Sequence, residues 1–531
     1  MKYLIKTFSL ICILNLAASC NKFIDTKPED YLTSANYYKT EAQLKYALNS
    51  IYSALAHYTL YGREMMRMGL DGEDGYYNVV TTFDGVKVYV VPSVDPDVAN
   101  FWATCYQGIY RANLLLENID KPESISQKNR DAIKGEALFL RSYFYFLLVS
   151  NFGGVPYVTV PTQQINVSRT SAEQIYKEII ADMEEAEGLV LTAKEVGFGG
   201  RISKSAVRGI LARVNLFRAG YPVYDAAGYT EARKWAKEVI DDTEAAHALN
   251  PNFAQVFINY SADQYDIKES IWEIEFWGNN RGTFKEGGQI GAYNGIRYTA
   301  ADPSYGYSTG IVNATGVLWE KYDSPNSLTS RDLRRDWTIA PFSVSGNPAI
   351  EQNRPIGEIY QRNCGKYRRK YEVVTPKDNQ YTPINFPVLR YADILLMFAE
   401  AENEVNGPTA DAYEAINLVR RRGFGKLLPG ATDVEEFDLG GLDQLQFRTE
   451  LQNERARELS FEYLRKGDLV RWNLFSTKMG EALTHAQNAS LPAGYSHAVR
   501  YFRNVSPRDI VWPIPAYELG VNRALIQNTG W

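Results

Sequence analysis

Two glutamate-rich runs hold the residues whose types and spacing could do chemistry. They contain Glu400, Glu402, Glu404, Glu450, Glu454, Glu458 and Glu462. Glycosidases use two carboxyl groups about 5 to 10 Å apart, one as acid and the other as nucleophile or base. In the second run, however, Arg457 and Arg465 stand three residues after a glutamate, which is the spacing of ion pairs on a helix. We therefore predict a solvated or interhelical salt-bridge face there, and arginine partners from a neighbouring helix for Glu400 and Glu404.

Motifs for other kinds of catalysis are missing from the sequence. The four histidines, His57, His247, His485 and His497, do not stand at metal-ligand spacing. There is no nucleophile elbow, phosphate-binding loop or dinucleotide fingerprint. Residues 70–77, "LDGEDGYY", faintly resemble a calcium loop, but Gly75 stands where the third acidic ligand is needed. The sequence thus favours a binding protein without catalytic residues, metal or cofactor.

The N-terminus, "MKYLIKTFSLICILNLAASC", has the features of an export signal. Lys2 and Lys6 precede an apolar run over residues 8–18, which is too short for a membrane span of about 20 residues. Small residues before Cys20 resemble the lipobox of bacterial lipoproteins. We therefore expect residues 1–19 to be removed and Cys20 to be acylated. An ordinary cleavage site with an incidental thiol is the alternative.

Charge and cysteine content exclude further classes of protein. The chain has 63 acidic and 57 basic residues, for a net charge of −6, so nucleic acid is not an expected partner. Once Cys12 and Cys20 are assigned to the leader, only Cys105 and Cys364 remain. Two cysteines are too few for a disulfide framework. A single bridge between them remains open, although Cys105 lies in an apolar helical segment and is expected to be a core residue.

Apolar residues at helical spacing predict the elements that position these groups. A buried helix ends at Gly153, and the other helices are expected over 36–57, 101–118, 172–187, 204–218, 229–241, 391–405, 411–421 and 446–464. Small and aromatic residues alternate in the hairpins 204–241 and 391–421, as in tetratricopeptide-like helix pairs. Between them, residues 243–388 contain short strand-like pieces and loops rich in Gly, Pro and Asn. We predict a mainly α scaffold that carries an irregular lobe.

Seven sequence blocks in order resemble the SusD/RagB family of outer-membrane nutrient-binding lipoproteins. They are "CNKFID", "IYRANLLLENI", "EALFLRSYFYFLLVSNFGGVPYV", "GRISKSAVRGILARVNLF", "VLRYADILLMFAEAENE", "NERARELSFEYLRKGDLVRW" and "VWPIPAYELGVNRALIQNTGW". The resemblance covers almost the whole chain after the leader. It implies one domain over 20–531, with four tetratricopeptide-like helix pairs in a scaffold over 36–242 and 389–475, the lobe 243–388 and a C-terminal segment 476–531.

The resemblance also implies a function. Such proteins are anchored by lipid to the outer membrane, face the cell exterior and cap a SusC-like TonB-dependent transporter. They bind oligosaccharide or polysaccharide, or peptide in some RagB-like members, and pass it to the transporter without cleaving it. They have no cofactor. We expect the same partners and location here, with peptide binding as the alternative to glycan binding.

The resemblance does not locate the ligand site, but the aromatic residues in glycine-rich loops suggest one. Sugar rings stack on aromatic faces while their hydroxyls hydrogen-bond to Asn, Asp and Arg at the edges. We predict stacking surfaces at Trp277 and at Tyr293 or Tyr298. We predict hydrogen-bonding partners at Asn279, Asn280 and Arg297. The loop 71–85 is expected to add Asp74, Tyr76 and Tyr77.

Overall fold

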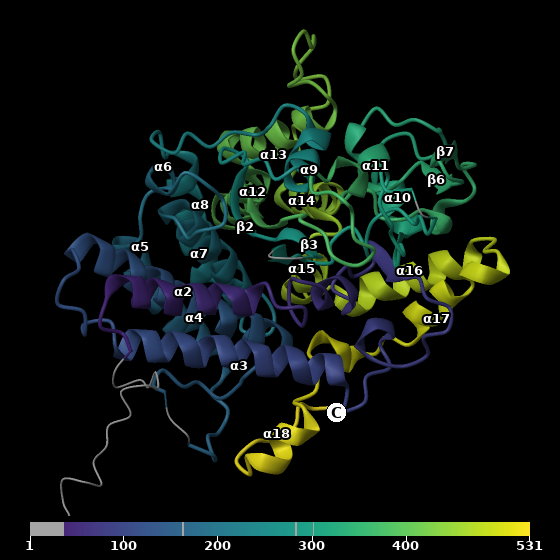
Figure 1. Ribbon diagram of the computed structural model, residues 1–531. Helices are drawn as coiled ribbons and strands as arrows, with labels where there is room; N and C mark the ends of the chain where they lie inside the picture. The colour runs from purple at the N-terminus through teal and green to yellow at the C-terminus, as the bar shows by residue number, and fades with distance from the viewer. Residues whose placement is uncertain (1–36, 162–163, 282–283, 301) are drawn as a thin grey trace, which may run out of the picture.

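The computed structural model describes residues 37–161, 164–281, 284–300 and 302–531 (Figure 1). The expected signal peptide and Cys20 lie outside these residues. In the described part, consecutive helices pack as α2 (Glu41–Leu55) with α3 (Pro96–Glu117), α4 (Gln127–Phe152) with α5 (Ala172–Leu189), α7 (Lys204–Ala219) with α8 (Ala227–Ile240), and α12 (Tyr391–Asn406) with α13 (Ala410–Gly423). Successive pairs contact one another through α3 and α4, α5 and α7, and α8 and α12. The predicted mainly α scaffold is confirmed.

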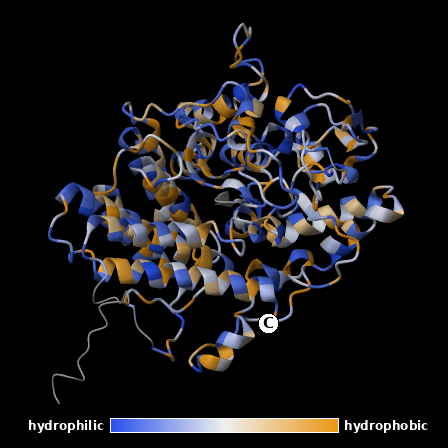
Figure 2. Ribbon diagram, viewed as in Figure 1, coloured by the Kyte–Doolittle hydropathy of each residue, from blue (hydrophilic) through white to orange (hydrophobic). Residues whose placement is uncertain are grey.

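Local sequence explains where these helices begin and end. Ser126, Ser171 and Ser203 each accept a hydrogen bond from a backbone N–H three residues later, which caps α4, α5 and α7. The end predicted for α4 is found at Gly153, whose φ of 71° suits glycine. Hydrophobic and hydrophilic residues alternate along α3 and its neighbours (Figure 2). Each helix therefore has an apolar face to bury against the next.

Close approach of two helices depends on one glycine. A Cβ atom on Gly108 of α3 would lie 2.3 Å from the Phe144 ring of α4. No side chain fits in that space, so the missing side chain lets the two helix backbones come together. Cys105 of α3 and Cys364 are both buried free thiols, and the bridge left open by the sequence is not formed.

The lobe over 243–388 contains short elements joined by long loops. They are α9 (Phe253–Ser261), β2 (Ser270–Ile274), β3 (Trp277–Arg281), β4 (Phe284–Glu286), β5 (Val312–Ala314), α10 (Gly316–Lys321), α11 (Leu333–Thr338), β6 (Phe342–Ser345), β7 (Ile350–Asn353) and β8 (Phe386–Arg390). Among the described residues the sheets are antiparallel pairs: β1 (Gly75–Tyr77) with β5, β2 with β8, β3 with β4, and β6 with β7. Strand β8 leads directly into α12, so the lobe is fastened to the scaffold.

The remaining helices complete the body on the C-terminal side. They are α6 (Ala193–Val196), α14 (Gln444–Leu459), α15 (Arg465–Arg471), α16 (Phe475–Asn488), α17 (His497–Arg503) and α18 (Ala516–Val521). Figure 1 places α16 and α17 beside the lobe, and α18 below α3 near the C-terminus. One hydrophobic cluster contains side chains from Tyr38 to Leu525, so scaffold and lobe share a core.

Glu454 and Glu458 of α14, with Glu462 just after it, belong to a buried ionic network rather than a solvated face, whereas the side chain of Glu450 is 36% exposed. Arg390 is 1% exposed and lies 2.9 Å from Glu269, 2.9 Å from Glu458 and 2.8 Å from Glu462. Lys366 lies 2.6 Å from Glu462. Burial raises the pKa of Glu458, but nearby arginines outweigh burial and lower this pKa to about 2. Glu458 therefore remains a carboxylate at neutral pH and holds no proton for acid catalysis.

The predicted arginine partners are found for most of the glutamates. Glu454 pairs with Arg457 at 2.7 Å, as its spacing predicts. Glu404 pairs with Arg448 of α14 at 2.6 Å. Glu400 pairs with Arg471 of α15 and accepts a 2.7 Å hydrogen bond from the Trp472 indole.

One predicted pair does not form. Arg465 turns away from Glu462 and contacts Glu73 of the loop before β1 at 2.5 Å. The reason is that Glu462 is already occupied by Arg390 and Lys366, whereas Glu73 is fully buried and needs a cation.

Candidate functional site

An open cleft lies where the end of α2 and the loop after it face strands β2 and β3. Its volume is about 1160 Å³. The side chains that line it are mostly aromatic or charged, and they include Tyr52, His57, Tyr58, Arg63, Phe198, Arg201, Glu273, Glu275, Trp277, Asn280, Glu286 and Tyr381. This composition suits a ligand that offers both a flat apolar face and many hydrogen-bonding groups.

The chain between β2 and β3 contributes alternately exposed and buried side chains to the cleft wall. Phe276 is buried, and its backbone N–H donates to Asn385 at 2.8 Å. Glu275 and Trp277 on either side of it both line the cleft, because residues two apart in extended chain share a face. The side chain of Trp277 is 42% exposed. Three residues later, Asn280 adopts a φ of 57°, a left-handed conformation that asparagine tolerates, and its exposed side chain also lines the cleft.

Aromatic rings form the opposite wall of the cleft. Tyr58 is 50% exposed, with the Arg63 guanidinium 5.1 Å from its ring centre. Arg201 lies 5.0 Å from the ring of Tyr52 in the same way. Such cation–π contacts hold flat side chains in place while one face remains open. The cleft therefore offers aromatic surfaces on both sides.

Two carboxyl groups lie together at one end of the cleft. Burial and the neighbouring Glu275 raise the pKa of Glu273 well above its usual value. Burial also raises the pKa of Glu275, although the Tyr265 hydroxyl donates to this carboxyl and opposes the rise. The room for both comes from glycines, because a Cβ on Gly199 would lie 2.7 Å from Glu273 and one on Gly200 would lie 2.0 Å from Glu275.

Of the nine predicted ligand-binding residues, Trp277 and Asn280 line the cleft. Tyr293 is half-buried against the core, close to the cleft residue Arg63, but does not line the cleft itself. Arg297 is exposed but lies outside the cleft, with its backbone N–H donating to Asn363 at 3.0 Å. Tyr77 is half-buried on β1, also outside the cleft.

Four predicted residues are buried, so their expected exposure is wrong. Tyr298 is 2% exposed, and its hydroxyl donates to the Gly346 carbonyl at 2.8 Å. Tyr76 is 1% exposed and donates to the Tyr360 carbonyl at 2.6 Å. In both cases the phenol fills a core position because its hydroxyl finds a backbone acceptor.

The two polar residues of this group are buried for different reasons. Asn279 is 5% exposed, and its amide donates to the Pro376 carbonyl at 2.8 Å, which holds a loop in place. Asp74 is fully buried. Burial raises the pKa of Asp74 to about 7, and Glu73 adds to this effect, while Arg465 at 3.8 Å opposes it.

The sequence interpretation missed most of the cleft. Glu275 could have been found, because it stands two residues before an exposed tryptophan in an extended segment. Tyr58, Arg63, Arg201 and Tyr381 come from three other segments of the chain. Nothing in their local sequence indicates that the fold brings them beside β3.

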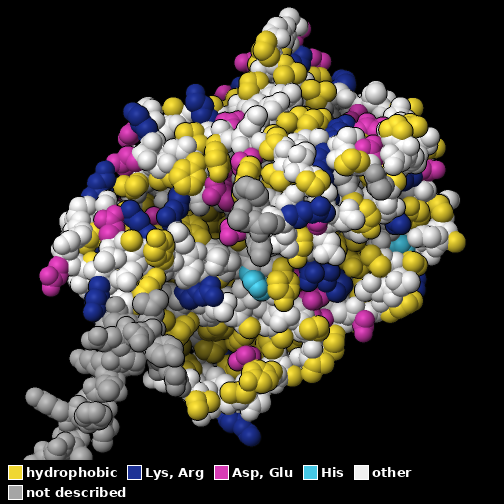
Figure 3. Space-filling view, in the orientation of Figure 1, with side chains coloured by type: hydrophobic (Ala, Val, Ile, Leu, Met, Phe, Trp, Pro, Cys, Tyr) yellow, Lys and Arg dark blue, Asp and Glu magenta, His cyan; other side chains and the backbone are white. Residues whose placement is uncertain are grey.

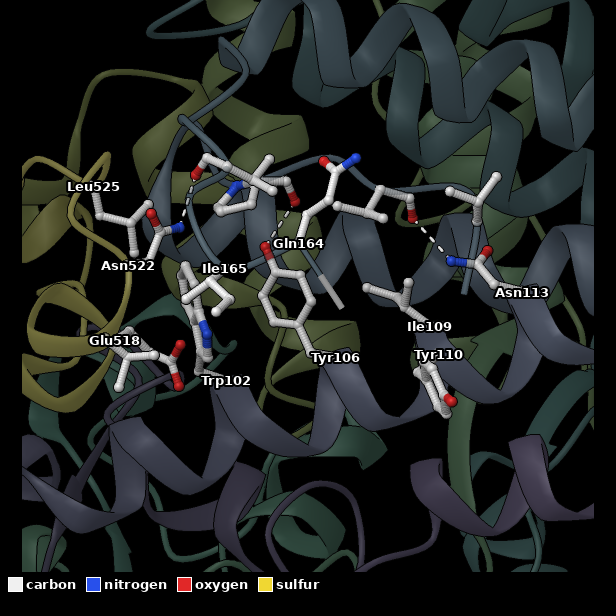
Figure 4. A pocket seen from close by; sticks show the side chains of 15 residues that line it. Trp102, Tyr106, Ile109, Tyr110, Asn113, Gln164, Ile165, Glu518, Asn522 and Leu525 are labelled. Atoms are coloured by element: carbon white, nitrogen blue, oxygen red, sulfur yellow. Dashed lines mark hydrogen bonds between the residues drawn. The ribbon is translucent and has the colours of Figure 1, made fainter. Parts of the chain in front are cut away.

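A second hollow runs along α3 and differs in character. Its volume is about 390 Å³. Trp102, Tyr106 and Tyr110 follow one another along one face of α3, and Ile165 and α18 close the other side (Figure 4). Figure 3 shows hydrophobic side chains edging a hollow between α3 and α18. We call it the α3 groove; its lining is mainly aliphatic and aromatic.

The described residues offer neither a metal site nor a membrane-spanning helix. Among them, no group of three His, Cys, Asp or Glu side chains is arranged to hold a metal ion. None of the described helices combines the length and the apolar character needed to cross a membrane.

Comparison with protein families identifies what kind of binding protein carries this cleft. A family model described as "SusD family" matches residues 268–531, and one described as "Starch-binding associating with outer membrane" matches residues 22–216. The chain belongs to the SusD family. SusD-like proteins bind carbohydrate and are not enzymes, which agrees with the burial and neutralisation of the α14 glutamates.

Individual SusD relatives match over most of their length. SusD-like protein P25 of Formosa agariphila is 27% identical over 559 residues, which cover 96% of this chain and 95% of that protein. The starch-binding protein SusD of Bacteroides thetaiotaomicron is 23% identical and is covered to 75%, with 78% of this chain. The crystal structure of a SusD homolog from Bacteroides thetaiotaomicron matches with a TM-score of 0.84 and 27% identity, and 94% of this chain and 98% of that one are covered.

Proposed function

We propose that this protein is a lipid-anchored outer-membrane protein that binds oligosaccharide or polysaccharide in the cleft around Trp277. It delivers this glycan to a SusC-like TonB-dependent transporter. One observation carries the proposal: a tryptophan that is 42% exposed lies inside a cleft of about 1160 Å³ that is lined by hydrogen-bonding side chains. A sugar ring stacked on this indole would have Glu275 and Asn280 within reach of its hydroxyls.

The family supports the glycan as ligand. One of the two matching models is described as starch-binding, and SusD of Bacteroides thetaiotaomicron carries the same description. We therefore keep glycan ahead of peptide as the ligand class. Among the residues predicted from sequence, the proposal retains Trp277 and Asn280 as ligand contacts and assigns Tyr293 a supporting role through Arg63.

The N-terminal assignments remain part of the proposal. Residues 1–19 act as a signal peptide, and Cys20 carries the acyl chains that anchor residues 20–531 as one domain. Two or more acyl chains anchor a protein stably, whereas one binds only marginally. The family description that mentions association with the outer membrane supports this location. A binder tethered beside a transporter raises the local concentration of ligand at the pore without any chemistry.

Affinity electrophoresis and calorimetry with a panel of starch, laminarin, xylan and casein-derived peptides test the proposal. We expect binding to at least one glycan, and a loss of at least tenfold in affinity for Trp277→Ala, because a buried stacking anchor contributes about 1–2 kcal/mol or more. Tyr517→Ala is the matched control, since Tyr517 is a 75% exposed aromatic residue on α18.

Three results would count against parts of the proposal. Glycan binding that is equal in Trp277→Ala and wild type would remove the cleft as the site. Trp277-dependent binding of peptides alone would favour the RagB-like alternative. Release of reducing sugar by the purified protein would contradict a binding role.

A further inference from the structure

Two carboxyl groups flank the Trp277 ring, and this arrangement bears on ligand class. Glu275 lies two residues before Trp277 in extended chain, so the two side chains point to the same side about 7 Å apart. Glu286 is paired directly opposite Trp277 in the β3–β4 hairpin. Side chains of directly opposed residues in an antiparallel pair lie about 5 Å apart at Cβ. Both glutamates line the cleft and are exposed.

The cations that line the cleft are already paired. Arg63 lies 2.7 Å from the carboxylate of Glu64, and its guanidinium is stacked on Tyr58. Arg201 lies 3.2 Å from Glu136 and is stacked on Tyr52. Glu136 therefore offsets the charge of Arg201, whereas Glu64 is shared between Arg63 and Arg67, which lies 2.9 Å from it.

Unlike the two arginines, the flanking carboxyl groups of Glu275 and Glu286 have no oppositely charged partner in an ion pair among the described residues. In the described part of the chain, Glu286 has no ion pair, and Glu275 accepts only the neutral Tyr265 hydroxyl. Glu273 is 3% exposed while Glu275 is exposed. Of two adjoining carboxyls, the buried one retains its proton and the exposed one ionises first. Glu275 and Glu286 therefore place negative charge beside Trp277, and Arg201 is near enough to Glu275 to favour its ionised form.

We propose, on the basis of the function proposed above, that the Trp277 cleft takes uncharged glycans and rejects those that carry carboxylate or sulfate groups. A carboxylate accepts strong hydrogen bonds from sugar hydroxyls. It repels a uronate or sulfate placed on the neighbouring ring. At separations of about 6–7 Å, one such repulsion weakens binding by between about threefold, at the dielectric constant of bulk water, and about seventyfold, at that of a protein surface.

Calorimetry with six polysaccharides tests this selectivity: starch, laminarin and xylan are neutral, whereas alginate, polygalacturonate and a sulfated carrageenan are anionic. The glycan that binds best is then converted to a carboxymethyl derivative and, as a control of equal bulk, to a hydroxyethyl derivative. We expect the carboxymethyl form to bind at least tenfold more weakly than the hydroxyethyl form at low salt. The difference should shrink at high salt, because screening weakens exposed charges.

Substitution of the flanking acids locates the effect. The double variant Glu275→Gln with Glu286→Gln should bind the carboxymethyl form about tenfold more tightly than wild type does. The control Glu435→Gln, an acid with an 82% exposed side chain, should change nothing. Equal binding of the two derivatives by wild type, or no gain in the double variant, would overturn the proposal.

The polysaccharide results separate this inference from the function on which it rests. Trp277-dependent binding of an anionic polysaccharide in preference to the neutral ones would overturn the selectivity and leave glycan binding intact. Binding of none of the six polysaccharides would count against glycan binding itself, and the selectivity would fall with it.

Discussion

The network around Arg390 and the cleft around Trp277 contain the same residue types, arginine, glutamate and aromatic residues. The side chains of the network are buried, whereas several side chains of the cleft are exposed to solvent. In the network, Arg390 contacts Glu269, Glu458 and Glu462, all of them buried. In the cleft, Arg63 and Arg201 are also paired with carboxylates, but Trp277 and Glu275 remain open to solvent. Arginine, glutamate and aromatic rings therefore indicate a ligand site only where their side chains stay exposed.

The largest expected effect comes from breaking the buried network. Arg390→Met leaves the carboxylates of Glu458 and Glu462 without one of their cations, and we expect the free energy of unfolding to fall by about 3–5 kcal/mol. Urea denaturation followed by circular dichroism measures it. Arg331→Met is the control, because Arg331 pairs with Asp323 on the surface with a 63% exposed side chain. The control should lose far less, because exposed ion pairs contribute little, and equal losses in the two variants would contradict the comparison.

A smaller effect on the free energy of unfolding, which depends on pH, is expected from Asp74, a buried acid outside the network. The pKa of Asp74 is raised to about 7 from its usual 3.8. Between these values the unfolded chain releases this proton and the folded chain retains it, so the contribution of Asp74 becomes increasingly destabilising as pH rises.

Asp74→Asn removes this penalty. Relative to wild type, the variant should gain about 3 kcal/mol in free energy of unfolding between pH 4.5 and pH 8.5. Thermal and urea unfolding at both pH values measure the gain. A difference between variant and wild type that does not change with pH would show that Asp74 is ionised throughout this range.

The smallest expected effect on stability comes from a substitution at Gly200 in the wall of the cleft. In Gly200→Ala, the new methyl group would lie within 2.0 Å of the Glu275 carboxyl and push it away from the wall. The end of a glutamate can move, so we expect unfolding to change by less than about 1 kcal/mol. Glycan affinity measured by calorimetry should nevertheless fall a few-fold. An unchanged affinity would show that the position of Glu275 is unimportant for binding.

The scaffold could be predicted from sequence because its signals are local. The apolar period, the capping serines and Gly153 all act within a few residues, and the helices form close to where they were expected. The cleft could be predicted only where it follows one strand, at Trp277 and Asn280. Tyr298 and Asn279 show why the rest failed: both have side chains that suit a ligand, but the fold uses them for the Gly346 and Pro376 carbonyls.

The central claim is that the solvent-exposed aromatic cleft around Trp277, rather than the apolar α3 groove, holds the glycan. A crystal structure of the protein with a bound oligosaccharide tests it most directly. The account predicts a sugar ring stacked on the Trp277 indole, with Glu275 or Asn280 within hydrogen-bonding distance of its hydroxyls. An oligosaccharide seated along Trp102 and Tyr110 in the α3 groove, with Trp277 uncovered, would contradict it.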